Sequence, residues 1–184
     1  MNKVILSVLG HDRPGIIAAA ANILFKCNCN IENVSQTILK TEFAGSFIIS
    51  MPPDLPQEEL RQALNEGLAA MNMHIHIEAV LKQNQGLVSS KAEPFVITTK
   101  GPDRKGLVAN ISAIIARYGA NVTNLQAVFK GGDDPGNNIM IYEVDIPVDI
   151  DRQDFYRALR AKAESLALSI SIQHRNIFET INRI

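Results

Sequence analysis

The stretch LGHDRPGI, at residues 9–16, stands between an apolar run and an amphipathic run of small residues. It recurs as KGPDRKGL at residues 100–107, an offset of 101 − 10 = 91 residues. Read without gaps, residues 10–37 and 101–128 are identical at 8 of 28 positions, and four of those eight lie in the loop itself. A repeat of this length exceeds the roughly 20–50 residues of solenoid units, so it indicates a duplicated domain.

Each copy has the pattern strand, helix, strand, strand, helix, strand. The apolar run Val4–Leu9 is typical of a central strand buried on both faces. Leucines recur at helical spacing after the prolines at 52–56, and apolar and polar residues alternate over 72–81. We expect strands at 4–9, 31–39, 46–51 and 72–81, with helices at 16–25 and 57–71 and a turn at 41–45. In the second copy we expect strands at 94–99, 122–130, 138–146 and 168–175, with helices at 106–118 and 152–166.

This order is that of the ferredoxin-like βαββαβ unit. The predicted fold class is therefore α+β, with two domains that each have an antiparallel four-stranded sheet and two helices on one face. The predicted boundaries are 1–83 for the first domain and 94–184 for the second, with a short tail from Ile177. Residues 84–93 are polar and small and are predicted to be a linker. The second copy also has an insertion, GGDDPG, at 131–136.

Composition excludes several classes of function. The formal net charge of −1 gives no basic excess, so direct nucleic-acid binding is disfavoured. No apolar run reaches the ~18 residues that a membrane span needs, and the N-terminus lacks the layout of a signal peptide, so we expect a cytoplasmic protein. Cys27 and Cys29 alternate near a strand and favour free thiols. His74 and His76 share one strand face, but two ligands are too few for a metal, and we expect neither a metal nor a cofactor.

The repeated loop has the chemistry of an anion site. The helix that follows it exposes free N–H groups and the positive end of its dipole, which suits a carboxylate. Asp12 is expected to cap that helix, Pro14 to lie in its first turn, and Gly15 to allow close approach to the backbone. Each element also has a plainer explanation. Asp12 and Asp103 can be caps only, and the arginines beside them can be surface charges worth roughly 0–1 kcal/mol.

A βαββαβ unit with G-x-D-R-x-G in its first loop and N-(I/V)-x-N at its second strand resembles the ACT domain. Two such units in one chain are similar to the glycine-cleavage-system transcriptional repressor family, through GHDRPGI at 10–16 and CNIE at 29–32. The resemblance implies an amino acid held between the first loop of one domain and the second strand of its neighbour. It implies these ligand-binding residues: His11, Asp12, Arg13, Gly15, Ile16, Asn30 and Ile31 in the first copy, and Asp103, Arg104, Gly106, Leu107, Asn121 and Val122 in the second.

The functional hypothesis is a non-enzymatic regulator. The resemblance implies that it binds a small amino acid, glycine in the repressor family, and acts on a protein partner, a transcription activator of glycine-cleavage genes. Exposed edge strands favour a homodimer or a pair of domains within the chain. One alternative is a general amino-acid sensor that regulates a metabolic enzyme. Another is an acylphosphatase-like hydrolase, with Arg13 in the loop and an asparagine on the second strand. Asp12 beside a phosphate argues against it.

Overall fold

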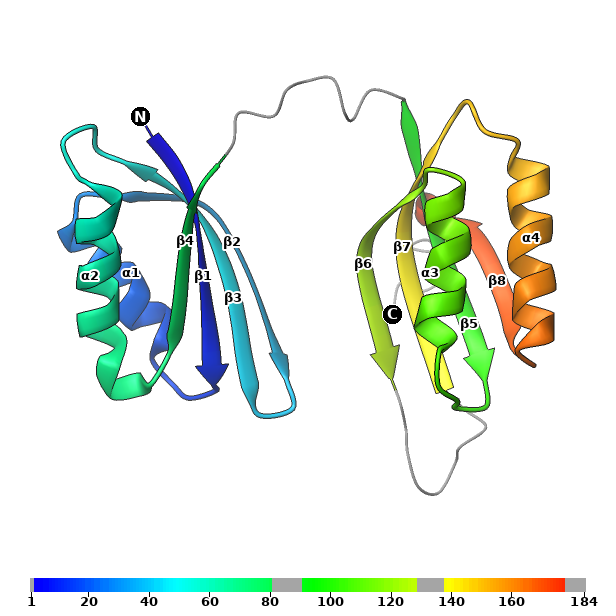
Figure 1. The fold of residues 1–184 in the computed structure, drawn as a ribbon, viewed down its shortest axis with the longest axis horizontal. Helices are drawn as coiled ribbons and strands as arrows, with labels where there is room; N and C mark the ends of the chain where they lie inside the picture. Colours follow the sequence, from blue (N-terminus) through cyan, green and yellow to red (C-terminus); the bar gives the residue numbers. More distant parts are fainter. Residues whose placement is uncertain (1, 81–90, 129–137, 178–184) are drawn as a thin grey trace. The chain divides into compact units, whose positions relative to one another are not determined.

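The structure is a computed structural model, and it describes residues 2–80, 91–128 and 138–177 (Figure 1). The chain forms two compact units, Met1–Asn84 and Gln85–Ile184. Most of the expected linker, the insertion at 131–136 and the tail beyond residue 177 lie outside the described residues. The two residues before Pro94 are described and belong to the first strand of the second unit, because they pair with Pro147 and Ile146.

The first unit has the predicted order of elements. They are β1 (Asn2–His11), α1 (Ile16–Lys26), β2 (Asn30–Leu39), β3 (Glu42–Met51), α2 (Gln57–Leu68) with a following 3-10 turn (Ala69–Met71), and β4 (His74–Ala79). The strands form one antiparallel sheet in the order β2-β3-β1-β4. Both helices lie on one face of that sheet (Figure 1). The central strand β1 is paired on both sides, and β2 is at an edge.

The second unit repeats this arrangement. It contains β5 (Ala92–Gly101), α3 (Leu107–Arg117), β6 (Asn121–Val128), β7 (Asn138–Pro147), α4 (Arg152–Ser165) and β8 (Ser169–His174). The sheet order is β6-β7-β5-β8, and every pair is antiparallel. The two units confirm the prediction of a duplicated βαββαβ fold.

Each core lies between one face of a sheet and the inner faces of its two helices. Alternate residues of β1 point to this face, and Val4, Leu6 and Val8 are all buried. Both helices of each unit bury residues four apart, the spacing of a single helical stripe. These residues are Ile16, Ala20 and Leu24 of α1, Leu60, Leu64 and Leu68 of α2, Leu107, Ile111 and Ile115 of α3, and Phe155, Leu159 and Ala163 of α4.

The turn predicted at 41–45 is wrong. β2 ends at Leu39 and β3 begins at Glu42, so the connection is a tight hairpin in which Lys40 has a positive φ of 58°. Gly45 is instead a buried position within β3. A Cβ there would lie 2.8 Å from the ring of Phe43, so glycine is required by packing rather than by a turn.

The buried aromatic residue of β3 gives a direct test of this core. Phe47 is 1% exposed, whereas Phe25 on α1 is 79% exposed. We predict that Phe47→Ala lowers the free energy of unfolding of the first unit by about 3–5 kcal/mol, because it leaves a cavity. The matched Phe25→Ala variant should change it by less than about 0.5 kcal/mol. Urea unfolding followed by NMR signals of β1 measures both. Equal losses would contradict the assigned core.

Candidate functional site

The first loop of the first unit ends in a left-handed glycine. Gly15 has φ 98° and stands at the N-cap of α1. The first backbone hydrogen bond of the helix runs from the Ala19 N–H to the Gly15 carbonyl, at 2.8 Å. The N–H groups of residues 16–18 precede that bond, so the helix itself gives them no acceptor. They form the positive end of the helix dipole.

The prediction that Asp12 caps α1 is wrong, and so is the placement of Pro14 in the first helical turn. No side chain caps this helix, and Pro14 comes two residues before it. Gly15 takes the N-cap position, and its left-handed backbone leaves Asp12 three residues outside the helix. The Asp12 N–H instead donates to the Thr41 carbonyl at 2.7 Å, which ties the loop to the β2–β3 hairpin. The Asp12 carboxylate is left for another role.

Part of the predicted site lies around one hollow of about 380 Å³ in the first unit. Four of the predicted residues line it: Asp12, Arg13, Gly15 and Ile16. The hollow is completed by Ile17 and Ala18 of α1, Gln36 of β2 and Phe43 of β3. Gln36 and Phe43 were missed because they come from strands about 20 to 30 residues further along the chain. The alternation of residues in the two paired strands could have found them. Phe43 and Gly45 share one face of β3, and Gln36 of β2 lies opposite Gly45.

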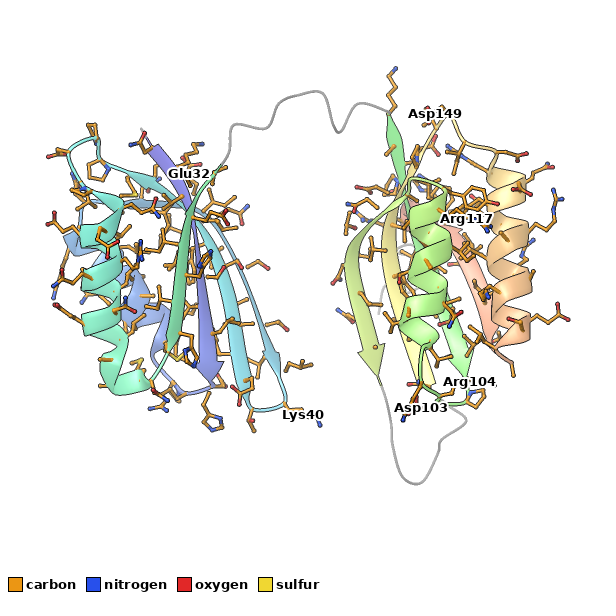
Figure 2. The ribbon with its side chains drawn as sticks, viewed as in Figure 1. Glu32, Lys40, Asp103, Arg104, Arg117 and Asp149 are labelled. Carbon is orange, nitrogen blue, oxygen red and sulfur yellow. The ribbon has the colours of Figure 1, made fainter. Side chains whose placement is uncertain are left out.

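The other predicted residues of the first unit do not line this hollow. His11 ends β1, and its Nδ1 lies 3.4 Å from Glu42 Oε1, with both side chains well exposed. Asn30 and Ile31 begin β2 opposite Ser50 and Ile49, far from the hairpin end where the loop is attached. Figure 2 shows Glu32 and Lys40 at opposite ends of this strand. Within one unit, the loop and the start of β2 therefore cannot hold the same small molecule.

The first loop of the second unit has the same backbone and different contacts. Gly106 caps α3 with φ 87°, and no side chain caps that helix. The prediction that Asp103 is a cap is therefore wrong as well. Its Oδ1 accepts a hydrogen bond from Asn138 Nδ2, at 3.3 Å, because β7 brings Asn138 opposite Gly101. Arg104 is exposed beside it, and Figure 2 shows both loop residues at the end of this unit where α3 begins.

Two predicted contacts are core side chains. Ile16 and Leu107 are each 2% exposed and pack beneath their helices, so only their backbone N–H groups face the loop. Asn121 and Val122 line a separate shallow hollow of about 500 Å³ between α3 and β6, beside small residues of α3. They do not meet Asp103, Arg104 or Gly106 in it.

The start of β2 is held by a charged cluster on the helix-free face of the sheet. Lys3 Nζ lies 2.6 Å from Glu32 Oε2, and Ser50 Oγ donates to Glu32 Oε1. The hydrogen bond from Lys3, followed by that from Ser50, lowers the pKa of the Glu32 carboxyl below its usual value. Glu32 is the extra residue of a bulge, since the pairing with β3 shifts between Ile31 and Asn33. The cluster therefore fixes the bulge that sets the register of the edge strand.

The cysteines and the potential metal ligands among the described residues do not form a reactive site. Cys27 and Cys29 are free thiols, and burial raises the pKa of Cys29 to about 11, with a further increase from Cys27, so its thiolate is scarce near neutrality. Among the described residues, no three His, Cys, Asp or Glu side chains gather where they could hold a metal ion. In the same part of the chain, no helix has the length and apolar character to cross a membrane.

The fold and its two glycine-capped loops define a tandem ferredoxin-like protein. Residues 2–78 and 93–173 each match the model of the ACT domain family. The chain belongs to the ACT domain family, as the repeated motif predicts. ACT domains are regulatory domains that bind amino acids.

Relatives and solved structures agree with this membership. The UPF0237 protein of Methanopyrus kandleri is 30% identical over 79 residues, which are 42% of this chain and 88% of the relative. That of Methanosarcina acetivorans is 31% identical over 91 residues, 49% of this chain and 95% of the relative. A structure of a Galdieria sulphuraria protein is similar with a TM-score of 0.79 at 22% identity, covering 94% of this chain and 98% of that one. One described as a glycine cleavage system transcriptional repressor has a TM-score of 0.71 at 14% identity, covering 94% and 96%. These two likenesses show the fold.

The left-handed glycine of the first loop can be tested by substitution. Gly15→Ala should lower the free energy of unfolding by about 1–2 kcal/mol, because a Cβ is strained at positive φ. A Cβ there would meet only Met71 Cε, at 3.8 Å, so backbone strain is the whole effect. Gly15→Asn should lose less, since asparagine tolerates this conformation. Chemical denaturation measures both. An alanine variant as stable as the parent would contradict the assigned φ.

The Glu32 cluster predicts a dependence on pH. Because the folded-state pKa of Glu32 is lowered, its contribution to stability is present above the unfolded-state pKa and is lost as the pH falls through the folded value. The variant Glu32→Gln should therefore be less stable than the parent at pH 7, and the difference should shrink below about pH 4.5. Urea unfolding at pH 7 and pH 3.5 measures it. A difference that stays constant across this range would rule out the charged pair as its source.

Proposed function

We propose that this protein is a non-enzymatic cytoplasmic regulator that binds a free small amino acid at its first loops and thereby controls a protein partner. The observation that carries the proposal is the hollow at the start of α1. It combines three backbone N–H groups that have no acceptor in the helix, the carboxylate of Asp12, which does not cap the helix, and the side-chain amide of Gln36. Membership of a family of amino-acid-binding regulatory domains supports the same reading.

The hollow is complementary to both charged groups of an α-amino acid. The carboxylate accepts hydrogen bonds from the N–H groups of residues 16–18, where the helix dipole also favours a negative charge. The ammonium donates to the Asp12 carboxylate and to the side-chain oxygen of Gln36. Phe43 and Ile17 leave room beside them for a small or apolar side chain. Glycine is the ligand that the resemblance to the repressor family favours.

A neighbouring edge strand would complete the site. Nine of the ten residues of β2 are exposed, and its Val34 and Ile38 are 49% and 51% exposed. An uncovered edge of this kind has reason to pair with another. We propose that β2 pairs with the same edge strand of a second chain, which would bring that chain's Asn30 to a first loop. Light scattering separates a dimer from a monomer.

The partner is proposed to be a transcription regulator of glycine-cleavage genes. Structural likeness to a protein described as a glycine cleavage system transcriptional repressor supports this choice. The net charge of −1 supports action through a protein rather than through DNA. Ligand would shift the partner equilibrium through its different affinities for the free and the partner-bound states.

Calorimetry of the full chain against each of the twenty amino acids tests the proposal. We expect at least one small amino acid to bind, and at 100 times its Kd to stabilise the protein by about 2.7 kcal/mol. Gly15→Ala should weaken binding at the first unit. Gly119→Ala is the matched control, because Gly119 also has a positive φ, 70°, and lies at the other end of a helix. It should cost similar stability and leave binding unchanged.

Three outcomes would count against parts of the account. Absence of binding by all twenty amino acids would contradict the sensor. Equal effects of the Gly15 and Gly119 variants would place the ligand elsewhere. A tight, salt-sensitive gel shift of DNA by this protein alone would contradict action through a partner.

A further inference from the structure

Two buried polar side chains lie beneath the first loop of the second unit. Thr99 on β5 is 0% exposed and Asn138 on β7 is 2% exposed. Within the part of the chain that the structure describes, neither Thr99 Oγ1 nor Asn138 Oδ1 has a hydrogen-bond partner. Buried polar atoms are nearly always paired, and leaving one unpaired costs free energy. These two atoms therefore need an explanation.

Both side chains point to the helix-covered face, at the end of the sheet where the loop begins. Asn138 pairs with Gly101 and Thr99 pairs with Met140, so Thr99, Gly101 and Asn138 alternate onto the same face. The Asn138 Nδ2 donates to Asp103 Oδ1 in the loop at 3.3 Å. The other end of that amide, Oδ1, therefore lies directly beneath the loop. Thr99 lies on this same face, two residues before Gly101 on β5.

The first unit has apolar residues at the same two places. There Gly10 pairs with Phe43, and Val8 pairs with Gly45. Val8 corresponds to Thr99, and Phe43 corresponds to Asn138. Both are buried, and Phe43 lines the hollow beside Asp12 and Gly15. The same fold thus closes this position with two apolar side chains in one unit and with two polar ones in the other. The polar pair is not a requirement of the fold.

We propose that the two first loops take amino acids of different side-chain chemistry, and that the second unit binds one with an uncharged hydrogen-bonding side chain, a hydroxyl or an amide. This inference rests on the proposed function. The Asn138 Oδ1 accepts a hydrogen bond from that side chain, and Thr99 Oγ1 donates or accepts a second one. The Asp103 carboxylate next to Asn138 disfavours an acidic side chain. The first unit, with Phe43 and Val8, takes a ligand with a small or apolar side chain.

Binding requires the second loop to open. Both unpaired oxygens are sealed, whereas Asp103, Arg104, Lys105 and Gly106 are all exposed. The hydrogen bond from Asn138 to Asp103, at 3.3 Å, is longer than the usual N–H···O distance of about 2.7–3.2 Å. A ligand side chain that donates to Asn138 can enter beside it, while the ligand carboxylate meets the N–H groups at the start of α3.

The test is an NMR titration of the full chain with serine, threonine, asparagine, glutamine, glycine, alanine and valine, each added separately. The amide signals of Gly106 and Leu107 report the second loop, and those of Gly15 and Ile16 report the first. We expect the hydroxyl and amide ligands to shift the second pair of signals and the small or apolar ligands to shift the first. Thr99→Val keeps the shape of the side chain and should weaken the polar ligands at least about tenfold, the loss of one hydrogen bond to a buried group. It should leave the apolar ligands within about twofold.

Two further variants keep the test decisive. Thr99→Ser keeps the hydroxyl that Thr99→Val removes, so it should bind the polar ligands as the parent does. Asn138→Leu removes the acceptor and should abolish it, with signal dispersion checking the fold of each variant. If Thr99→Val and Asn138→Leu bind polar ligands like the parent, the pair does not contact the ligand and the inference is wrong. Shifts confined to the first loop for all seven ligands, the hydroxyl and amide ones included, would refute this inference and leave the proposed function intact. No shift at either loop would refute both.

Discussion

The left-handed backbone at Gly15 and Gly106 is the constraint on which the rest of each unit depends. It lets the chain leave the central strand, turn within a few residues and start a helix whose first buried residue, Ile16 or Leu107, enters the core. An L-residue with a Cβ is strained in this conformation. Because glycine also occupies the N-cap, no side chain satisfies the first N–H groups of either helix. The element that closes the fold is thus also the element that leaves donors free for a ligand.

The two units share one fold but differ in the residues that lie beneath their first loops. The helices, the sheet order and the positive φ are repeated, so both units offer the same donors to a carboxylate. What differs is the pair of residues under the loop, Phe43 and Val8 in one unit and Asn138 and Thr99 in the other. In the proposed function, duplication would preserve recognition of the group common to all amino acids, and the residues beneath each loop would select the side chain.

The sequence predicted the fold well, because strand alternation, helical stripes and the repeat all reflect which residues are buried. The sequence predicted the wrong role for Asp12. Capping preferences favour aspartate at an N-cap, but they do not show that a left-handed glycine three residues later takes that position. It missed Gln36 and Phe43, whose place at the loop is set by the pairing of β2 with β3. Gapless comparison of the copies could align Thr99 with Val8, 91 residues apart. It could not align Asn138 with Phe43, because 138 − 43 = 95 and the offset changes across the insertion.

The central claim is that the N–H groups at the start of the first helix donate hydrogen bonds to the carboxylate of an amino acid. Hydrogen exchange of the full chain, with and without a saturating small amino acid, tests it most directly. The account predicts slower exchange at residues 16–18 when the ligand is present, and no change at residues 57–59, which begin α2. Unchanged exchange at residues 16–18 with the ligand bound would contradict it.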